Sequence, residues 1–357
     1  MQSDIADRYR LLGAPHNMTF PSSTTAETDA DAVDTVAAAA GSSVAIVGRS
    51  PGQLMWRRFR RDRTGVIAAV VVLAFILIAL LAPVISWAYG KNPDDYYGLN
   101  QPGLLNEYGY PILPNGGISG DFWFGLEPLV GRDVLTQLIY GIRTSITIAL
   151  IVTVLSTVIG VTLGITSGYV GGKVDYAIGR VIDTLLSFPS QLFLIVLVPV
   201  VDAALVLPTQ EPPTWLRFVS ICIVLTVLGW ATTARLLRAQ VLSLREREFI
   251  ESARVTGASP ARIIFKELMP NLWTPIIIQA TLALPLYVGA EAGLGFLGVG
   301  MPEAIPDWGR MFLVGSNVYH SDVTYLMFPG VSMLIFVIAF NLLGDSIRDA
   351  FDPKTKR

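Results

Sequence analysis

The segment that comes nearest to a phosphate-binding loop is Gly168-Tyr169-Val170-Gly171-Gly172-Lys173. A P-loop requires a glycine where this chain has Ser167 and a serine or threonine where it has Val174. Those residues matter because backbone N–H groups cradle the phosphates and the hydroxyl binds Mg²⁺. The segment fails at both positions, so we expect nucleotide hydrolysis to lie on other chains.

A second glycine-rich segment, residues 293–298, has the G-x-G-x-x-G spacing of dinucleotide-binding loops. That motif is meaningful only where it follows a strand and opens a helix. Here it comes at the end of an apolar run with no βαβ pattern around it. We therefore predict a glycine-rich helix exit at this place.

Other catalytic chemistry has little support in the sequence. The single cysteine, Cys222, excludes an internal disulfide and a cysteine-rich metal site. The two histidines, His16 and His320, are far apart, and no nucleophile, base and metal set converges. The net charge of −2 gives no basic field for nucleic acid. We predict a protein that is not an enzyme, has no cofactor of its own and does not bind nucleic acid.

Residues 245–271 are the most informative polar segment. Helix formers dominate up to Thr256, Gly257 suits a left-handed helix end, Ser259 suits a helix N-cap and Pro260 suits the first helical position. The pattern predicts a charged, amphipathic helix–tight turn–helix. Such an element either docks into a groove on a cytosolic partner or lies on lipid headgroups.

The elements around this segment are predicted to be membrane-spanning helices. The chain of 357 residues is 52% hydrophobic and 15% charged, whereas soluble domains have about 25% charged residues. Six uncharged apolar runs are long enough to cross a bilayer as helices. The predicted spans lie at about 65–90, 144–172, 180–201, 217–235, 268–292 and 323–345.

The distribution of basic residues predicts the orientation of these spans. With a cytoplasmic N-terminus, 21 of the 26 Lys and Arg residues fall inside, as the positive-inside rule requires. The prediction is an all-α membrane protein with both termini cytoplasmic. Its parts are a basic segment at 49–64 that contacts membrane lipids, an outer loop at 91–143, a cytoplasmic loop at 236–267 and a tail at 346–357. Residues 1–48 are polar and acidic, and we predict a largely disordered cytoplasmic extension there.

Two further features of the spans lead to predictions. Gly160, Gly164, Gly168 and Gly172 recur every four residues, which allows another helix to approach closely. Three carboxylates lie at or near span ends, where we expect them to sit at the membrane interfaces because a charge is costly at the bilayer centre. These carboxylates are Asp183, Glu291 and Asp345.

The 245–271 segment resembles the EAA loop of ABC-importer permeases. The shared pattern is Glu251, Ala253 and Gly257, followed by an apolar segment that ends in Leu268-Met269-Pro270. Ser252 replaces the usual second alanine, which exchanges one small residue for another.

The resemblance covers roughly residues 50–357 and is to the C-type (DppC/OppC-like) permease subunit of dipeptide/oligopeptide ABC importers. The segments that resemble this family include the signature at residues 341–353. The others are 131–135, 138–145, 183–189, 291–300 and 306–309.

This resemblance implies a non-catalytic permease with a cytoplasmic EAA-type coupling helix in the bacterial inner membrane, forming half of a peptide translocation pathway. The implied partners are a second homologous permease, two cytosolic ATPases that bind ATP and Mg²⁺, an extracytoplasmic binding protein and the peptide. The residues implied in the ATPase-coupling surface are Glu251, Ser252, Ala253, Gly257, Ala258 and Pro260. The resemblance also implies that Gly257 occupies a turn that only a small residue fits.

Some alternatives stay open. Asp307 and Trp308 are candidates for an outer gate or a binding-protein contact, although tryptophan also serves as an interface anchor. A permease of the same architecture could import nickel chelates, glutathione or another small solute. An ion-coupled secondary transporter or channel would instead work without ATPase partners, and a membrane-embedded enzyme lacks a convergent catalytic set.

Overall fold

The computed structural model describes residues 51–206 and 212–351. The chain divides into two units, Met1–Ser50 and Pro51–Arg357, and all the helices named below belong to the second unit. The predicted extension at 1–48 and residues 352–357 of the predicted tail lie outside the described residues. Within the described ranges the regular structure is helical, with isolated bridges and no strand.

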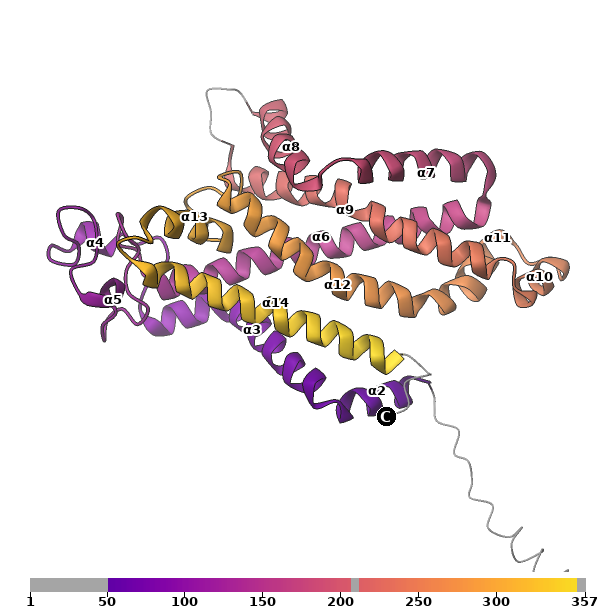
Figure 1. Ribbon diagram of the computed structural model, residues 1–357, viewed down its shortest axis with the longest axis horizontal. Helices are drawn as coiled ribbons and strands as arrows, with labels where there is room; N and C mark the ends of the chain where they lie inside the picture. The colour runs from indigo at the N-terminus through magenta and orange to yellow at the C-terminus, as the bar shows by residue number, and fades with distance from the viewer. Residues whose placement is uncertain (1–50, 207–211, 352–357) are drawn as a thin grey trace, which may run out of the picture. The chain divides into compact units, whose positions relative to one another are not determined.

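Five helices of the described region are long and apolar enough to cross a membrane, and a bent pair makes a sixth crossing if it is counted as one span. This arrangement agrees with the six spans predicted from hydropathy (Figure 1). The single helices are α3 (Arg63–Tyr89), α6 (Val134–Val170), α9 (Thr214–Leu244), α12 (Met269–Phe296) and α14 (Val323–Phe351). The bent pair consists of α7 (Gly172–Ser187) and α8 (Ser190–Leu205).

The bent pair differs from the straight span predicted at 180–201. α7 and α8 meet at an angle of 97°, with Phe188 and Pro189 between them. Proline lacks an N–H group, and the residue before it is pushed out of the helical region. Phe188 accordingly has extended φ/ψ values of −86° and 142°. The third crossing is therefore two half-helices.

Two helices extend beyond their predicted ends. α6 begins at Val134 rather than near residue 144, because the Asp133 carboxylate caps it and accepts the backbone N–H of Thr136 at 2.8 Å. α9 continues to Leu244, nine residues past the predicted limit at 235, and Leu237 and Val241 of its last turns are completely buried. An apolar run predicts which part of a helix lies in the lipid. The ends of the helix itself are set by backbone and capping hydrogen bonds.

Shorter elements cap the two ends of the helical bundle (Figure 1). At one end lie the small helices of the loop between α3 and α6, together with α13; at the other end lies α10. The bounds are α2 (Pro51–Arg61), α4 (Tyr97–Asn100), α5 (Pro114–Gly117), α10 (Glu248–Val255), α11 (Pro260–Arg262), a π-helix (Ile263–Leu268) and α13 (Trp308–Val318).

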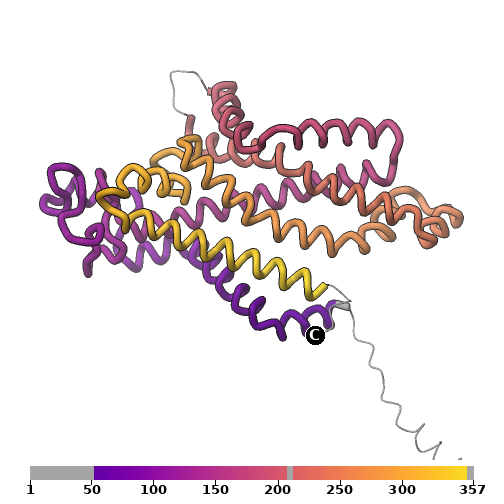
Figure 2. Tube along the Cα trace, in the orientation of Figure 1, coloured from indigo at the N-terminus to yellow at the C-terminus, as the bar shows by residue number. Residues whose placement is uncertain are grey.

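The closest helix pair is α6 with α9, which run side by side in Figures 1 and 2. Three of the four regularly spaced glycines face α9. A Cβ atom on Gly160 would lie 2.7 Å from the Thr233 side chain, and one on Gly164 would lie 2.7 Å from the backbone oxygen of Ala234. Gly168 is as tightly packed against Val241, whereas Gly172 lies past the end of α6 with open space beside it. The predicted small-residue contact is confirmed for the first three positions.

We expect Gly164→Ala to destabilise the protein by about 1–3 kcal/mol, because the added methyl group meets the α9 backbone, which cannot move away. Gly179→Ala in α7 is the matched control, since its Cβ would meet nothing within 4 Å. That change should be neutral or stabilising by about 0.5–1 kcal/mol. Thermal unfolding midpoints of the purified membrane protein measure both. Equal midpoints for the two variants would contradict the close α6–α9 contact.

Candidate functional site

The segment predicted to be helix–tight turn–helix forms an elbow, defined here as residues 245–262. α10 ends in a Schellman motif: the Gly257 N–H donates to the Arg254 oxygen and the Ala258 N–H donates to the Ala253 oxygen, both at 3.0 Å. The Ser259 hydroxyl then caps α11 by accepting the N–H of Arg262 at 3.3 Å. Local side-chain and backbone capping therefore builds the elbow as the sequence predicts.

Gly257 occupies the turn for a conformational reason. Its φ is +79°, in the left-handed region that strains residues with a Cβ atom. A Cβ atom here would nevertheless meet nothing within 4 Å. The expectation that only a small residue fits the turn is thus corrected, since the backbone conformation rather than lack of space restricts this position.

α10 has one buried face and one exposed face. Ile250 is completely buried against the cluster that includes Val241 and Leu268. Ala253 and Ala258 are half-buried at the edge of that cluster. The opposite face exposes polar groups and apolar side chains together. Its members include Glu251, Ser252, Phe249 and Val255, and Pro260 is exposed on α11. An exposed, mixed polar and apolar face on a packed base is typical of a protein-binding surface.

Arginine side chains fix the elbow to the end of α6. Arg245 donates a hydrogen bond to the backbone oxygen of Gly168 at 3.1 Å. The Arg254 guanidinium lies 5.6 Å from the centre of the Tyr169 ring, within cation–π range. On its other side the elbow continues through the π-helix directly into α12. The elbow is therefore connected to α6, α9 and α12.

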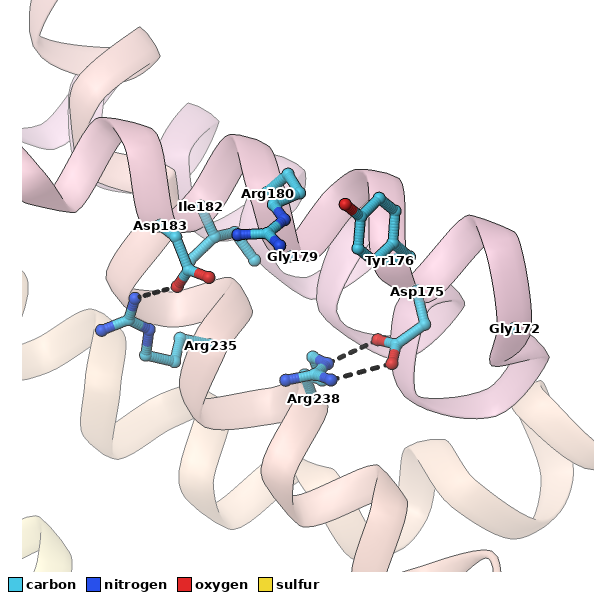
Figure 3. A pocket seen from close by; sticks show the side chains of 9 residues that line it. All are labelled: Gly172, Asp175, Tyr176, Gly179, Arg180, Ile182, Asp183, Arg235 and Arg238. Atoms are coloured by element: carbon cyan, nitrogen blue, oxygen red, sulfur yellow. Dashed lines mark hydrogen bonds and ion pairs between the residues drawn. The ribbon is translucent and has the colours of Figure 1, made fainter.

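Ion pairs then connect α9 to the bent pair. Asp175 of α7 faces Arg238 of α9 and accepts two hydrogen bonds from it, at 2.5 and 2.8 Å (Figure 3). The Ser167 hydroxyl of α6 also donates to Asp175, at 2.5 Å. Asp183 faces Arg235 at 2.6 Å, in an exposed pair that contributes little to stability (Figure 3).

The Asp175–Arg238 pair was not identified from the sequence. The two residues are 63 positions apart, and the available signal was an acidic residue in the first turn of an amphipathic helix. Together with Asp183 and Arg235 they line a cavity of about 390 Å³ between α7 and α9. The pair gives α7 a bidentate, charge-assisted attachment to α9.

At the opposite end of α12 the structure places Asp307 and Trp308 inside the protein, both with no exposed surface. Asp307 caps α13 by accepting the N–H of Arg310 at 2.6 Å. The Trp308 ring packs against Phe75 and Phe336 and donates to the Ser332 hydroxyl at 2.9 Å. Neither side chain is available for contact with an external protein in this structure, so their geometry is that of an internal anchor.

Glu291 also lies inside the protein, near the end of α12, and its expected place at the membrane interface stays a prediction. It is completely buried and lies close to Ser145 of α6. It interacts electrostatically with Asp307. Burial raises the pKa of Asp307 to about 6, although the backbone N–H of Arg310 opposes the shift. The described residues contain no group of three His, Cys, Asp or Glu side chains that could hold a metal ion.

Multiple membrane crossings, a bent third span and a packed elbow between the fourth and fifth crossings together define a polytopic membrane permease. The model for "binding-protein-dependent transport system inner membrane component" matches residues 160–357, which is more than half of the chain. The model for the "N-terminal TM domain of oligopeptide transport permease C" matches residues 50–102. The chain belongs to this permease family and is a multi-pass protein of the bacterial inner membrane.

Relatives and a solved structure agree with this assignment. The chain is 36% identical to the dipeptide transport system permease protein DppC of Escherichia coli K12, covering 87% of this chain and 96% of DppC. It is 34% identical to the glutathione transport system permease protein GsiD of Salmonella typhimurium LT2, covering 86% and 92%. A chain of the MetNI methionine ABC transporter in an inward-facing conformation has the same fold, with a TM-score of 0.50, 20% identity and coverage of 60% and 96%.

The raised pKa of Asp307 predicts a pH-dependent stability. The folded state keeps a proton that an unfolded aspartate loses near its usual pKa of 3.8. The stabilisation is therefore complete below that value and is lost as the pH rises through about 6. Asp307→Asn preserves an oxygen that can cap α13 but does not titrate.

As the pH rises from 3.8 to about 6, the window set by these two pKa values, the thermal midpoint of the wild type should fall relative to that of Asp307→Asn. Asp94→Asn, at an exposed position, controls for the loss of one negative charge. Parallel pH curves for the wild type and Asp307→Asn would contradict the assignment.

Proposed function

We propose that this chain is the permease subunit of an ATP-driven ABC importer for di- and oligopeptides and forms half of the translocation pathway. The observation that supports this most directly is the elbow, where an exposed α10 face sits on a base packed against three membrane-crossing helices. Two cytosolic ATPases, which bind ATP and Mg²⁺, are the proposed occupants of this face and of its counterpart on a second, homologous permease. An extracytoplasmic binding protein delivers the peptide.

The coupling surface in this proposal consists of Glu251, Ser252, Ala253, Gly257, Ala258 and Pro260. Glu251 and Ser252 lie on the exposed face, while Ala253 and Ala258 seat α10 on its base. Gly257 and the capped Pro260 turn hold α10 at a fixed angle to α11. A push on α10 then reaches α12 through the π-helix and α6 through Arg245.

The bent third span receives the same motion through α9. Because Asp175 bonds to both Arg238 and Ser167, α7 follows α6 and α9 when the elbow moves. The junction at Phe188–Pro189 is the natural place for the change in angle, since it already interrupts helical hydrogen bonding. In this mechanism the chain converts motion of an external motor into alternating access and catalyses no reaction itself.

The peptide substrate is supported by the family models and by the dipeptide permease relative. The similarity to a glutathione permease favours a second candidate, import of glutathione, which is itself a tripeptide derivative. Both candidates use the same coupling geometry, so the choice rests on the solute.

Replacing Gly257 should uncouple peptide import from ATP hydrolysis by the partner ATPases. Gly257→Val places a β-branched residue at φ +79°, at a cost of roughly 1–2 kcal/mol, and should distort the turn. We expect assembly to persist while peptide import per ATP hydrolysed falls several-fold in proteoliposomes. Gly257→Asn is the matched control, because asparagine tolerates the left-handed conformation. Wild-type coupling in Gly257→Val would refute this role for the turn.

Substrate class is tested by uptake. A strain lacking this gene should lose import of labelled di- to hexapeptides, and the chain expressed with its partner subunits should restore it. Labelled glutathione is measured in parallel. Unchanged peptide uptake in the deletion strain, together with lost glutathione uptake, would replace the first candidate with the second.

A further inference from the structure

A cavity of about 400 Å³ lies where the bent span meets α9 and α12. Its walls come from the α7–α8 junction, from the middle of α9 and from the second half of α12. Its polar lining consists of Ser190, Gln191, Thr232, Thr233, Gln279 and Tyr287, and the other lining residues are apolar or glycine. The volume is in the range of small-ligand sites.

The cavity lies beside the middle of α9. Its α9 wall runs from Leu225 to Thr233, and α9 extends from Thr214 to Leu244. Eleven residues therefore separate each end of the wall from the corresponding end of the helix. Discontinuous helices near the midplane commonly form substrate sites in transporters, because broken helices place polar groups where lipid cannot satisfy them.

Several polar groups of the lining have no hydrogen-bond partner among the described residues. Among the described residues, the side chains of Gln191, Gln279 and Thr232 form no hydrogen bond, and neither does Thr233, which is only 3% exposed. Two free amide groups facing lipid hydrocarbon would each cost several kcal/mol on the scale of unsatisfied polar groups. The lining is therefore suited to water or a polar solute.

One side of the cavity has a fixed shape. Tyr287 crosses the face of α9 at Gly229, where a Cβ atom would collide with the phenol, and its hydroxyl donates to Ser156 of α6 at 2.9 Å. This hydrogen bond ties the cavity wall on α12 to the α6–α9 pair. The wall consequently moves with the helices that the elbow controls.

The charge of the lining distinguishes this cavity from two others. None of the described residues that line it is charged, whereas the cavity between α7 and α9 is lined by aspartates and arginines. A cavity of about 690 Å³ between α3, α6 and α14 has a nearly all-apolar lining, with Ser332 as its one hydroxyl-bearing residue. The cavity between α7 and α9 suits ion pairs within the protein. The cavity between α3, α6 and α14 suits acyl chains or apolar helix contacts.

We infer that the cavity at the α7–α8 junction is a transit site for the backbone of the imported peptide, with Gln191 and Gln279 as its amide-recognising residues. This inference rests on the proposed peptide-import function. An amide side chain both donates and accepts hydrogen bonds, which matches the N–H and C=O groups of every peptide unit. A neutral lining neither attracts nor repels particular side-chain charges, so peptides of varied sequence can pass.

Thiol accessibility tests whether the cavity is open to a solute. Cys222 is the sole cysteine, so Cys222→Ala gives a thiol-free background. In the assembled transporter in nanodiscs, Thr232→Cys should react with a cationic methanethiosulfonate reagent. Val196→Cys on α8 is the control, because Val196 is 63% exposed but does not line the cavity. We expect it to react at least about tenfold more slowly, since a thiolate does not form in an apolar environment.

Trialanine is the probe for occupancy. Added with the loaded binding protein and a non-hydrolysable ATP analogue, it should slow the labelling of Thr232→Cys at least about threefold, whereas the same mixture without peptide should not. A Thr232→Cys thiol as unreactive as that of Val196→Cys, or labelling that peptide does not slow, would overturn the transit site.

Transport gives an independent readout. Gln191→Leu with Gln279→Leu should lower trialanine import per ATP hydrolysed by about fivefold or more, because the peptide loses two hydrogen-bonding side chains. Gln240→Leu, on α9 away from the cavity, should behave as wild type. Unchanged import in the double variant would overturn the inference while leaving peptide import intact. Failure of the wild-type complex to import trialanine would instead contradict the proposed function.

Discussion

The close contact of α6 with α9 is the constraint on which the rest of the structure depends. In lipid, helices associate through packing rather than through the hydrophobic effect, so small residues at the interface decide how near two backbones come. Gly160, Gly164 and Gly168 bring α6 against the backbone of α9. α9 in turn bears the arginines that contact α7 and the glycine that admits Tyr287, and Arg245, directly after α9, contacts α6. A wider separation would break all of these contacts together.

Two kinds of polar group lie around the α6–α9 pair, and they are arranged in different ways. Near α10, charged side chains are paired at short range, as Arg238 is with Asp175 and Arg245 is with the Gly168 carbonyl. In the cavity beside the middle of α9 the polar groups are neutral, and several of them, such as Gln279 of α12, have no hydrogen-bond partner among the described residues. In the proposed mechanism the charged pairs transmit motion because they hold a fixed geometry, and the neutral groups line the passage for the solute. The proposal thus assigns both coupling and passage to the same helices.

At the end opposite α10, the structure is held by internal groups. Asp307 caps α13, Trp308 joins α3, α6, α13 and α14 through aromatic and hydrogen-bond contacts, and Glu291 lies buried nearby. This end is therefore held by internal contacts, and the pKa of the Asp307 carboxyl group is raised there. We expect the motion proposed for the elbow to pivot about this end. A firmly packed end at α13 and an elbow connected to several helices at the other end suit an alternating-access mechanism.

The sequence by itself determined the number of crossings, the elbow and the glycine contact, because each depends on local properties: apolar length, capping residues such as Gly257 and Ser259, and residue size at fixed spacing. The tertiary structure alone decided the partner of Asp175, the burial of Glu291 and the sharp bend at Pro189. Ion pairs across 63 residues and the depth of a side chain depend on how helices pack, and a proline permits a bend without requiring it. Packing of helices distant in sequence, which hydropathy does not encode, also created the neutral cavity at the α7–α8 junction.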